Sequence, residues 1–185
     1  MCLKGKTALV TGGARGIGLG IAERLAADGA RIALADLNAD QLSEAAGNFD
    51  DGTVITIAAD VTDRQQVIDA IDRTAEELGG FDIMINNAGI AQVQPIADIT
   101  EAEMDKVFAV NVKGVLWGIQ AAAARFRKDG TKGKIISANE GNVDRNKLQT
   151  DIDALTDQIE SVVTAAQFNG LNLLQGTEDV EVLSS

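Results

Sequence analysis

The stretch Thr11-Gly12-Gly13-Ala14-Arg15-Gly16-Ile17-Gly18 decides the fold, because it joins the pattern of a strand to that of a helix. The apolar run before it, Thr7-Ala8-Leu9-Val10, is typical of a buried strand. Glycines in such a junction allow a tight turn and a close approach of the backbone to a pyrophosphate. The helix N-terminus adds N–H groups and a partial positive charge. The predicted phosphate-binding residues are Gly12, Arg15, Gly16, Ile17 and Gly18.

The rest of residues 1–138 alternates strand and helix patterns. The first helix carries Ile17, Ile21, Leu25 and Ala26 on one face and ends at Gly29. Further strands are predicted over 31–35, 54–57, 81–85 and 133–137, with a short helix over 40–48. Capping-box patterns at 62–65 and 100–103 predict two more helices, the second long and running towards 126. This alternation predicts an α/β fold, a doubly wound parallel sheet of Rossmann type covered by helices.

Composition excludes several classes of function. The 185 residues suit about one domain and are 45% hydrophobic, with no apolar run of membrane-spanning length. The N-terminus lacks a signal-peptide pattern, so we expect a cytoplasmic protein away from membranes. Cys2 is the single cysteine and histidine is absent, which predicts no disulfide and no metal site. The net charge of −12 argues against a nucleic-acid partner.

The last 47 residues differ in character from the rest. Residues 139–185 hold 2 basic and 9 acidic side chains, a net charge of −7, whereas residues 1–138 hold 14 and 19, a net charge of −5. Leu148, Ile152, Leu155, Ile159 and Val162 form a heptad seam, which predicts an amphipathic helix. Asn169-Gly170 is a turn signal, and the alternation over 180–182 predicts a short strand in an irregular tail. We therefore expect two segments, 1–138 and 139–185.

Asp36 ends the second strand pattern, 18 residues after Gly18. A carboxylate there can accept hydrogen bonds from both ribose hydroxyls of NAD. It would repel the 2′-phosphate of NADP by about 1–4 kcal/mol at ~4 Å, which disfavours NADP by about tenfold or more. Arg15 opposes this preference, because a basic side chain in the loop can meet a 2′-phosphate. The prediction is NAD, bound at Asp36 and Leu37; the alternative is that Asp36 is a simple strand-end turn residue.

Residues 1–138 resemble the short-chain dehydrogenase/reductase family. Besides the glycine loop, the matching motifs are Asp60-Val61, Asn86-Asn87-Ala88-Gly89 and Val110-Asn111-Val112-Lys113-Gly114. The resemblance implies that Asp60 and Val61 border the adenine and that Asn87, Ala88 and Gly89 lie along the cofactor. It also implies that Asn111 helps to hold a proton-relay water, and that the strand order is 3-2-1-4-5. Within the family, the residues around Asp36 and Gly89 most resemble acetoin/diacetyl reductases.

The family's hydride-transfer chemistry uses a Ser after the fifth strand and a Tyr-x-x-x-Lys on the next helix. Counting from Ile135-Ile136-Ser137, the Ser position falls at Glu140, and the Tyr and Lys positions fall near Asp153 and Asp157. The chain contains no tyrosine at all. Loss of a general acid alone removes about 10²–10⁴ in rate. Asn111 is thus the one catalytic position of the family that this chain retains, and we expect it to be inactive.

From Asn139 onward the sequence resembles the N-terminal rod region of bacterial flagellin. The resemblance rests on the stretch 138–145, the heptad seam and the stretch 164–174, which includes Gln167-Phe168-Asn169-Gly170. It implies a fusion of two unrelated partial frames near residue 138, leaving the sheet truncated after its fifth strand. The alternative is an ordinary acidic amphipathic helix that caps a truncated domain.

Four functions follow from these segments. The first is a cofactor-binding oxidoreductase fragment without catalysis, its ancestral substrate a carbonyl compound or alcohol such as acetoin or diacetyl. The second is a structural or assembly module, in which the heptad helix mediates self-association or contacts flagellin. The third is an active dehydrogenase that borrows a tyrosine from another chain, and the fourth is a marginally stable product with no function.

Overall fold

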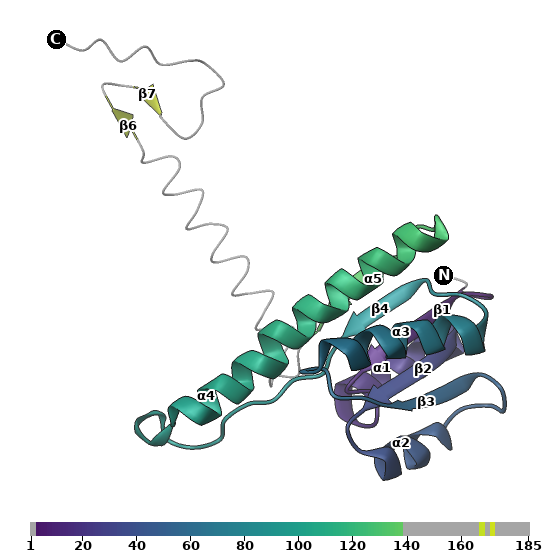
Figure 1. Cartoon of the computed structure of the whole chain (residues 1–185), viewed down its shortest axis with the longest axis horizontal. Coiled ribbons are helices and arrows are strands. Elements are labelled where there is room, and N and C mark those ends of the chain that lie inside the picture. The colour runs from purple at the N-terminus through teal and green to yellow at the C-terminus, as the bar shows by residue number, and fades with distance from the viewer. Residues whose placement is uncertain (1–2, 139–166, 169–170, 173–185) are drawn as a thin grey trace. The chain divides into compact units, whose positions relative to one another are not determined.

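The computed structural model describes residues 3–138, 167–168 and 171–172 (Figure 1). The chain divides into two compact units, Met1–Gly141 and Asn142–Ser185. The strands of the first unit are β1 Thr7–Thr11, β2 Arg31–Asp36, β3 Val54–Ala58, β4 Ile83–Asn86 and β5 Lys134–Ser137. Its α-helices are α1 Gly16–Ala27, α2 Ala39–Ala46, α3 Arg64–Leu78, α4 Glu101–Phe108 and α5 Val115–Asp129.

The five strands form one sheet in the order β3-β2-β1-β4-β5, with every neighbouring pair parallel. This confirms the predicted doubly wound sheet and its order. β1 lies in the centre, where Leu9 is in register with Ala33 of β2 on one side and Met84 of β4 on the other. β5 forms one edge of this sheet, and Ile136 on it is 48% exposed. Because these strands are parallel, the C-terminal ends of β1, β2 and β4 lie at the same edge of the sheet.

Alternate residues of the strands build two cores, one on each face of the sheet. Leu9, Ala33 and Met84 face the helices α3 and α5, which lie side by side on one face (Figure 1). Val10 and Leu34 face the other side, where Ala22 of α1 and Leu42 of α2 cover them. Strands buried on both faces are typical of a parallel sheet between helices.

The first helix packs three of the four residues predicted on one face, Ile21, Leu25 and Ala26, against the core. Gly18 and Ala22 are its buried residues, whereas Ile17 is 46% exposed and Ile21 and Leu25 are only partly buried against the core. The small side chains let α1 approach the sheet closely, so the bulkier ones lie at the sides of the contact. Ile17, predicted on the same face as these residues, is therefore the one of the four that lies at the exposed margin of the contact.

The helix predicted from the pattern at 62–65 begins one residue later than expected. Asp63, not Thr62, is the N-cap, and its carboxylate accepts hydrogen bonds from the amides of Gln65 and Gln66. The hydrogen bond from the Gln66 side chain lowers the pKa of Asp63 most, and the bonds from the two amides lower it further. Thr62 instead donates its hydroxyl hydrogen to Asp60. The box predicted at Thr100 and Glu103 is confirmed, with both reciprocal bonds present.

The long helix predicted after Thr100 is continuous but not regular. Between α4 and α5 the residues Ala109–Gly114 form a π-helical segment. The helix Glu101–Asp129 is 29 residues long and, by length and composition alone, apolar enough to cross a membrane. The expectation considered uninterrupted apolar runs and did not take in the mean hydropathy of this helix, which is 1.4 over an 18-residue window. A stripe of apolar side chains along this helix is 39–53% exposed, and it consists of Met104, Phe108, Val112, Leu116 and Ile119.

In the second unit the described residues are two short strands. β6, Gln167–Phe168, pairs in antiparallel register with β7, Leu171–Asn172. They flank Asn169-Gly170, the dipeptide that predicted a turn. The turn itself, the heptad seam and the strand predicted at 180–182 lie outside the described residues.

We predict that Gly118→Ala destabilises the fold by about 1–3 kcal/mol, because a methyl group there would overlap Asn86 Oδ1 and approach Met84. Urea unfolding followed by circular dichroism measures the change. Gly20→Ala is the matched control on α1, since no atom of the described residues lies within 4 Å of its added Cβ. That control should gain up to about 1 kcal/mol from helix propensity. Equal stability of the two variants would contradict the close packing of Gly118 against Asn86.

Candidate functional site

A cleft of about 330 Å³ lies at the C-terminal ends of the strands. The segments that follow β1, β2, β3 and β4 form it, together with one residue of the helical segment Ala109–Gly114. The lining residues are Gly12, Arg15, Ala35, Asp36, Leu37, Asn38, Gln41, Ala59, Asp60, Val61, Ala88, Gly89, Ile90 and Val110. In doubly wound sheets, ligands bind in the crevice outside the carboxyl ends of the strands.

The glycine loop has backbone shapes that favour glycine. Gly12 and Gly16 have φ values of +63° and +56°, in the left-handed region. A Cβ on Gly12 would lie 2.9 Å from Ala88 Cα, and one on Gly18 would overlap the carbonyl of Gly12. The loop is thus folded tightly on itself and on the segment after β4. The N-cap of α1, Arg15, makes no side-chain capping bond, so an anionic group can take that role.

The hydroxyl of Thr11 ties the glycine loop to the end of β4. Thr11 Oγ1 donates to the carbonyl of Ile85 at 3.2 Å and accepts from the amides of Asn87 and Ala88 at 3.0 and 3.1 Å. The Asn87 side chain is fully buried, and its Nδ2 donates to the carbonyls of Thr11 and Gly12. These bonds hold two walls of the cleft in one arrangement.

Asp36 lies at the end of β2 and on the wall of the cleft. Its Oδ2 accepts from the amide of Ala14 and its Oδ1 from the amide of Asn38, both at a long 3.3 Å. A carboxylate has about four acceptor sites, so at least two remain for a ligand. The two bonds orient the carboxylate without using up its capacity to bind hydroxyl groups.

Asp60 and Val61 follow β3 and line the same cleft, beside the end of β2 that carries Asp36. The amide and hydroxyl of Thr62 both donate to Asp60 Oδ1 at 2.8 Å, and the Asp60 amide donates to Gln66 Oε1. Val61 also contacts the π-helical segment, because a Cβ on Gly114 would lie 3.0 Å from Val61 Cγ2. Asp60 is therefore held as the first residue of a rigid turn.

Asn111 lies in the π-helical segment and holds the segment after Gly89. Its Oδ1 accepts from the amide of Ile90 at 2.9 Å, and its Nδ2 donates to the carbonyl of the same residue at 2.8 Å. The side chain thus pairs with a backbone segment that lines the cleft. The water-holding role implied by the family resemblance stays a prediction.

Of the predicted site residues, eight line the cleft together: Gly12, Arg15, Asp36, Leu37, Asp60, Val61, Ala88 and Gly89. Gly18 and Asn87 lie behind its wall, while Gly16 and Ile17 open α1. Sequence reasoning missed the remaining lining residues, which are Ala35, Asn38, Gln41, Ala59, Ile90 and Val110. Asn38 caps α2 by accepting from the amide of Gln41, and the pattern Asn-x-x-Gln before a helix could have indicated it. Glu140, Asp153 and Asp157 lie outside the described residues.

The geometry defines a sheet of Rossmann type with a glycine-lined ligand cleft, and comparison with known proteins assigns the family. The short-chain dehydrogenase family model matches residues 6–147. The chain therefore belongs to the short-chain dehydrogenase family. A second model, the bacterial flagellin N-terminal helical region, matches residues 122–179. The two matches overlap over 122–147, so the flagellin resemblance begins earlier than the predicted residue 139.

The curated relatives are reductases and dehydrogenases of small molecules. The chain is 49% identical over 137 residues to the L-2,3-butanediol dehydrogenase of Corynebacterium glutamicum, covering 72% of this chain and 53% of that protein. It is 49% identical over 135 residues to a diacetyl reductase of Staphylococcus aureus, covering 72% and 52%. A 3-ketoacyl-(acyl-carrier-protein) reductase from Brucella melitensis, solved in complex with NADH, is 31% identical with a TM-score of 0.68, covering 73% and 57%. The chain spans about half the length of the curated relatives it matches.

We predict that Thr11→Val costs about 2–4 kcal/mol of unfolding free energy, because two amides and one carbonyl lose their partner. Thr74→Val is the matched control, since Thr74 is equally buried and its hydroxyl bonds only the helix carbonyl of Ala70. Chemical denaturation of both variants measures the difference. A loss no larger for Thr11→Val than for Thr74→Val would show that the hydroxyl does not hold the cleft.

Proposed function

We propose that this chain binds a nicotinamide dinucleotide in the cleft, with NAD preferred over NADP. The observation that carries the proposal is the convergence of the glycine loop, Asp36 and Asp60 on one cleft. The glycine loop and the start of α1 would hold the pyrophosphate, and Asp36 would accept from the adenosine ribose. Asp60 and Val61 would border the adenine, with Ala88 and Gly89 along the rest of the cofactor. The similar structure solved in complex with NADH supports a nicotinamide dinucleotide as the ligand.

The preference for NAD rests on charge. Asp36 carries a carboxylate on the cleft wall, and a 2′-phosphate beside it would be repelled. Arg15 lines the same cleft and acts in the opposite direction, but it is exposed and bonds no carboxylate within 3–138. Asp36 is fixed by two backbone amides, so its charge is the more localised of the two.

We expect Asp36→Asn to reduce the ratio of NADH affinity to NADPH affinity by about tenfold or more, because the repulsion of a 2′-phosphate disappears. Isothermal titration with each cofactor measures both affinities. Asp40→Asn on α2 is the control, because Asp40 does not line the cleft. No NADH binding at millimolar concentration by the unaltered chain would refute the proposal and leave only the fold.

We further propose that the chain does not catalyse hydride transfer by itself. In the family, a tyrosine exchanges the carbonyl proton, and this sequence has none. Asn111 is retained, but in the described residues its side chain pairs with Ile90. The ancestral activity would be oxidation and reduction of a small alcohol or ketone, as the names of the relatives suggest.

The expected result of an NADH-oxidation assay with diacetyl or acetoin is no turnover above a blank without protein. A full-length diacetyl reductase serves as the positive control in the same buffer. Steady turnover by this chain, in proportion to its concentration, would overturn the proposal and favour a tyrosine supplied by another chain.

A second function is assembly through residues 139–185. The flagellin match over 122–179 favours it, as does the heptad seam, because such a seam buries its apolar residues only against a partner helix. We propose that the join of the two frames lies near residue 138. Co-sedimentation with flagellar filaments tests a flagellin contact, and a chain that stays in the supernatant would argue against it.

A further inference from the structure

A second hollow, the helix groove, lies between α3 and α5. Its volume is about 210 Å³, and none of its residues lines the cofactor cleft. Its apolar lining comes from Ile68 and Ile71 of α3 and from Ala121 and Ala124 of α5. Alanines on one side of a groove allow another backbone to approach closely. The groove can therefore accept apolar side chains of a third helix.

Two contacts fix the separation of the helices that form the groove. Near one end, the guanidinium of Arg64 lies 5.4 Å from the centre of the Trp117 ring. Near the other end, Arg125 Nη1 lies 2.8 Å from Asp72 Oδ1, and Arg125 also bonds Asp129 on its own helix. Hydrogen bonds to Asp129 and Asp72 raise the pKa of Arg125 despite its partial burial. The groove is thus a preformed feature of two parallel helices.

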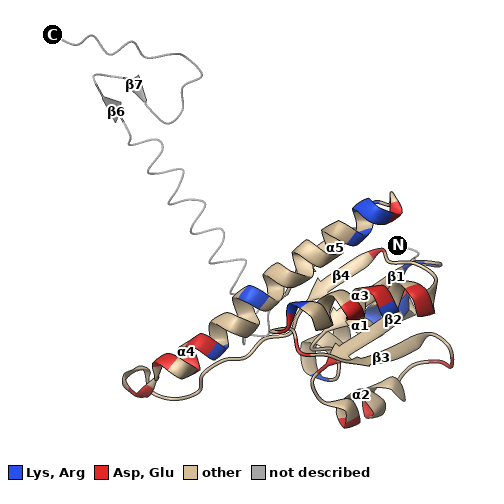
Figure 2. Ribbon diagram, in the orientation of Figure 1, with Lys and Arg blue, Asp and Glu red and all other residues tan. Residues whose placement is uncertain are grey.

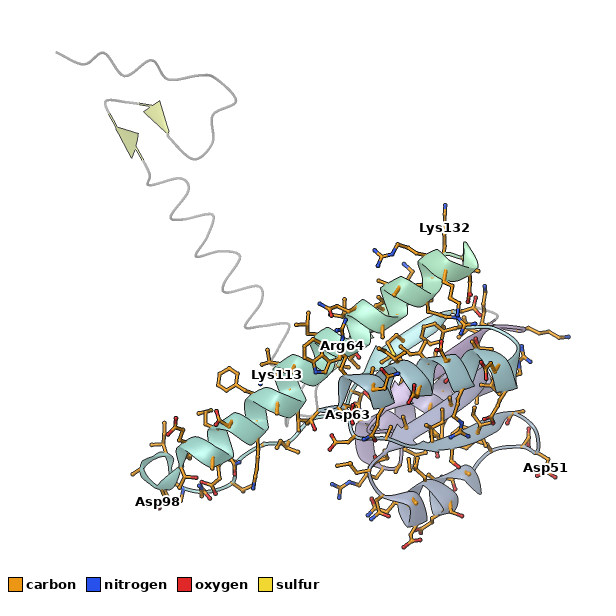
Figure 3. The ribbon with its side chains drawn as sticks, viewed as in Figure 1. Asp51, Asp63, Arg64, Asp98, Lys113 and Lys132 are labelled. Atoms are coloured by element: carbon orange, nitrogen blue, oxygen red, sulfur yellow. The ribbon has the colours of Figure 1, made fainter. Side chains whose placement is uncertain are left out.

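The charge of the groove is opposite to that of the chain as a whole. Three cations line it, Arg64, Arg125 and Lys128, against the single carboxylate of Asp72, whereas the net charge of the chain is −12. Figure 2 shows basic residues at the C-terminal end of α5, and Figure 3 labels Arg64 at the start of α3. Within residues 3–138, Arg64 and Lys128 form no ion pair with a carboxylate. The two ends of the groove thus offer cations to an acidic partner.

The sequence contains a segment with the complementary pattern. Residues 144–166, the heptad segment, combine an apolar seam with the acidic residues Asp151, Asp153, Asp157 and Glu160. The seam from Leu148 to Val162 spans 15 residues, the same length as α3 and α5, or about 22 Å as a helix. Heptad seams pack against the grooves of neighbouring helices.

We propose that the helix groove is the docking site for the heptad segment of a second molecule of this chain. Seam residues would enter between Ile68 and Ala121, and the acidic flanks would face Arg64 and Lys128. The proposal rests on the assembly role of residues 139–185 and is independent of cofactor binding. Reciprocal docking of this kind gives a closed dimer.

The test measures the dimer dissociation constant of the full chain by analytical ultracentrifugation. The double variant Arg64→Glu, Lys128→Glu should weaken dimerisation by about tenfold or more, because two attractive contacts become repulsive. Asp153→Lys, Asp157→Lys should weaken it similarly. A mixture of the two variants should restore a heterodimer, since each then offers the charge that the other needs.

The control is Lys4→Glu, Arg24→Glu, which changes the net charge equally but lies outside the groove. This control should leave the dissociation constant within about twofold of the original. Circular dichroism of every variant verifies that the first unit remains folded. Added salt should weaken the dimer of the unaltered chain, because exposed charge pairs are screened.

Three outcomes would overturn the proposal in different ways. A dimer that the groove variant leaves intact, but that the heptad variant abolishes, would retain the assembly role and exclude the groove. A dimer lost only on Phe108→Glu would assign association to the exposed stripe of α4 and α5. A chain that stays monomeric at every concentration would exclude docking between two molecules and self-association through residues 139–185.

Discussion

The hydroxyl of Thr11 is the constraint on which the cleft depends. It is one small group at the end of the central strand, yet it satisfies two amides and one carbonyl of the segment that ends β4. Buried amides without partners are costly, so the two strand ends cannot separate without breaking several bonds together. The fully buried Asn87 then fastens the carbonyls of Thr11 and Gly12 from the other side. The ligand cleft is a consequence of this junction.

Closely packed glycines hold the helices against the strand ends that the Thr11 hydroxyl joins. Gly18 sits so near the Gly12 carbonyl that no side chain fits, and Gly118 of α5 lies against Asn86 of β4 in the same manner. The helices on both faces thus approach the sheet at its carboxyl edge. Gly114, in contact with Val61, brings the π-helical segment beside the turn after β3. From there Asn111 reaches Ile90, so the last wall of the cleft is held by a helix distortion.

Much of the fold could be predicted because a parallel sheet leaves strong local signals. Short apolar runs separated by amphipathic helices determine the order of elements, and the glycine loop marks the turn after β1. The predictions that failed concern choices between neighbours. Asp63 caps α3 in place of Thr62 because Thr62 is bonded to Asp60, a contact that a capping pattern does not encode. Ile17 lies at the side of the helix contact because Gly18 and Ala22 occupy its centre.

The sequence by itself determined the alternation of elements, the glycine loop, the acidic end of β2 and the absence of tyrosine. Each of these is a local or compositional property, readable from residue identities in order. Only the tertiary structure decided that Asn38, Gln41 and Val110 share a wall with Asp36 and Asp60, and that α3 and α5 enclose a basic groove. Asn38 and Gln41 follow Asp36 closely in the chain, whereas Asp60, Val110 and the two helices are distant in sequence. The distant parts meet because parallel strands carry their loops to the same edge and their crossover helices to the same face.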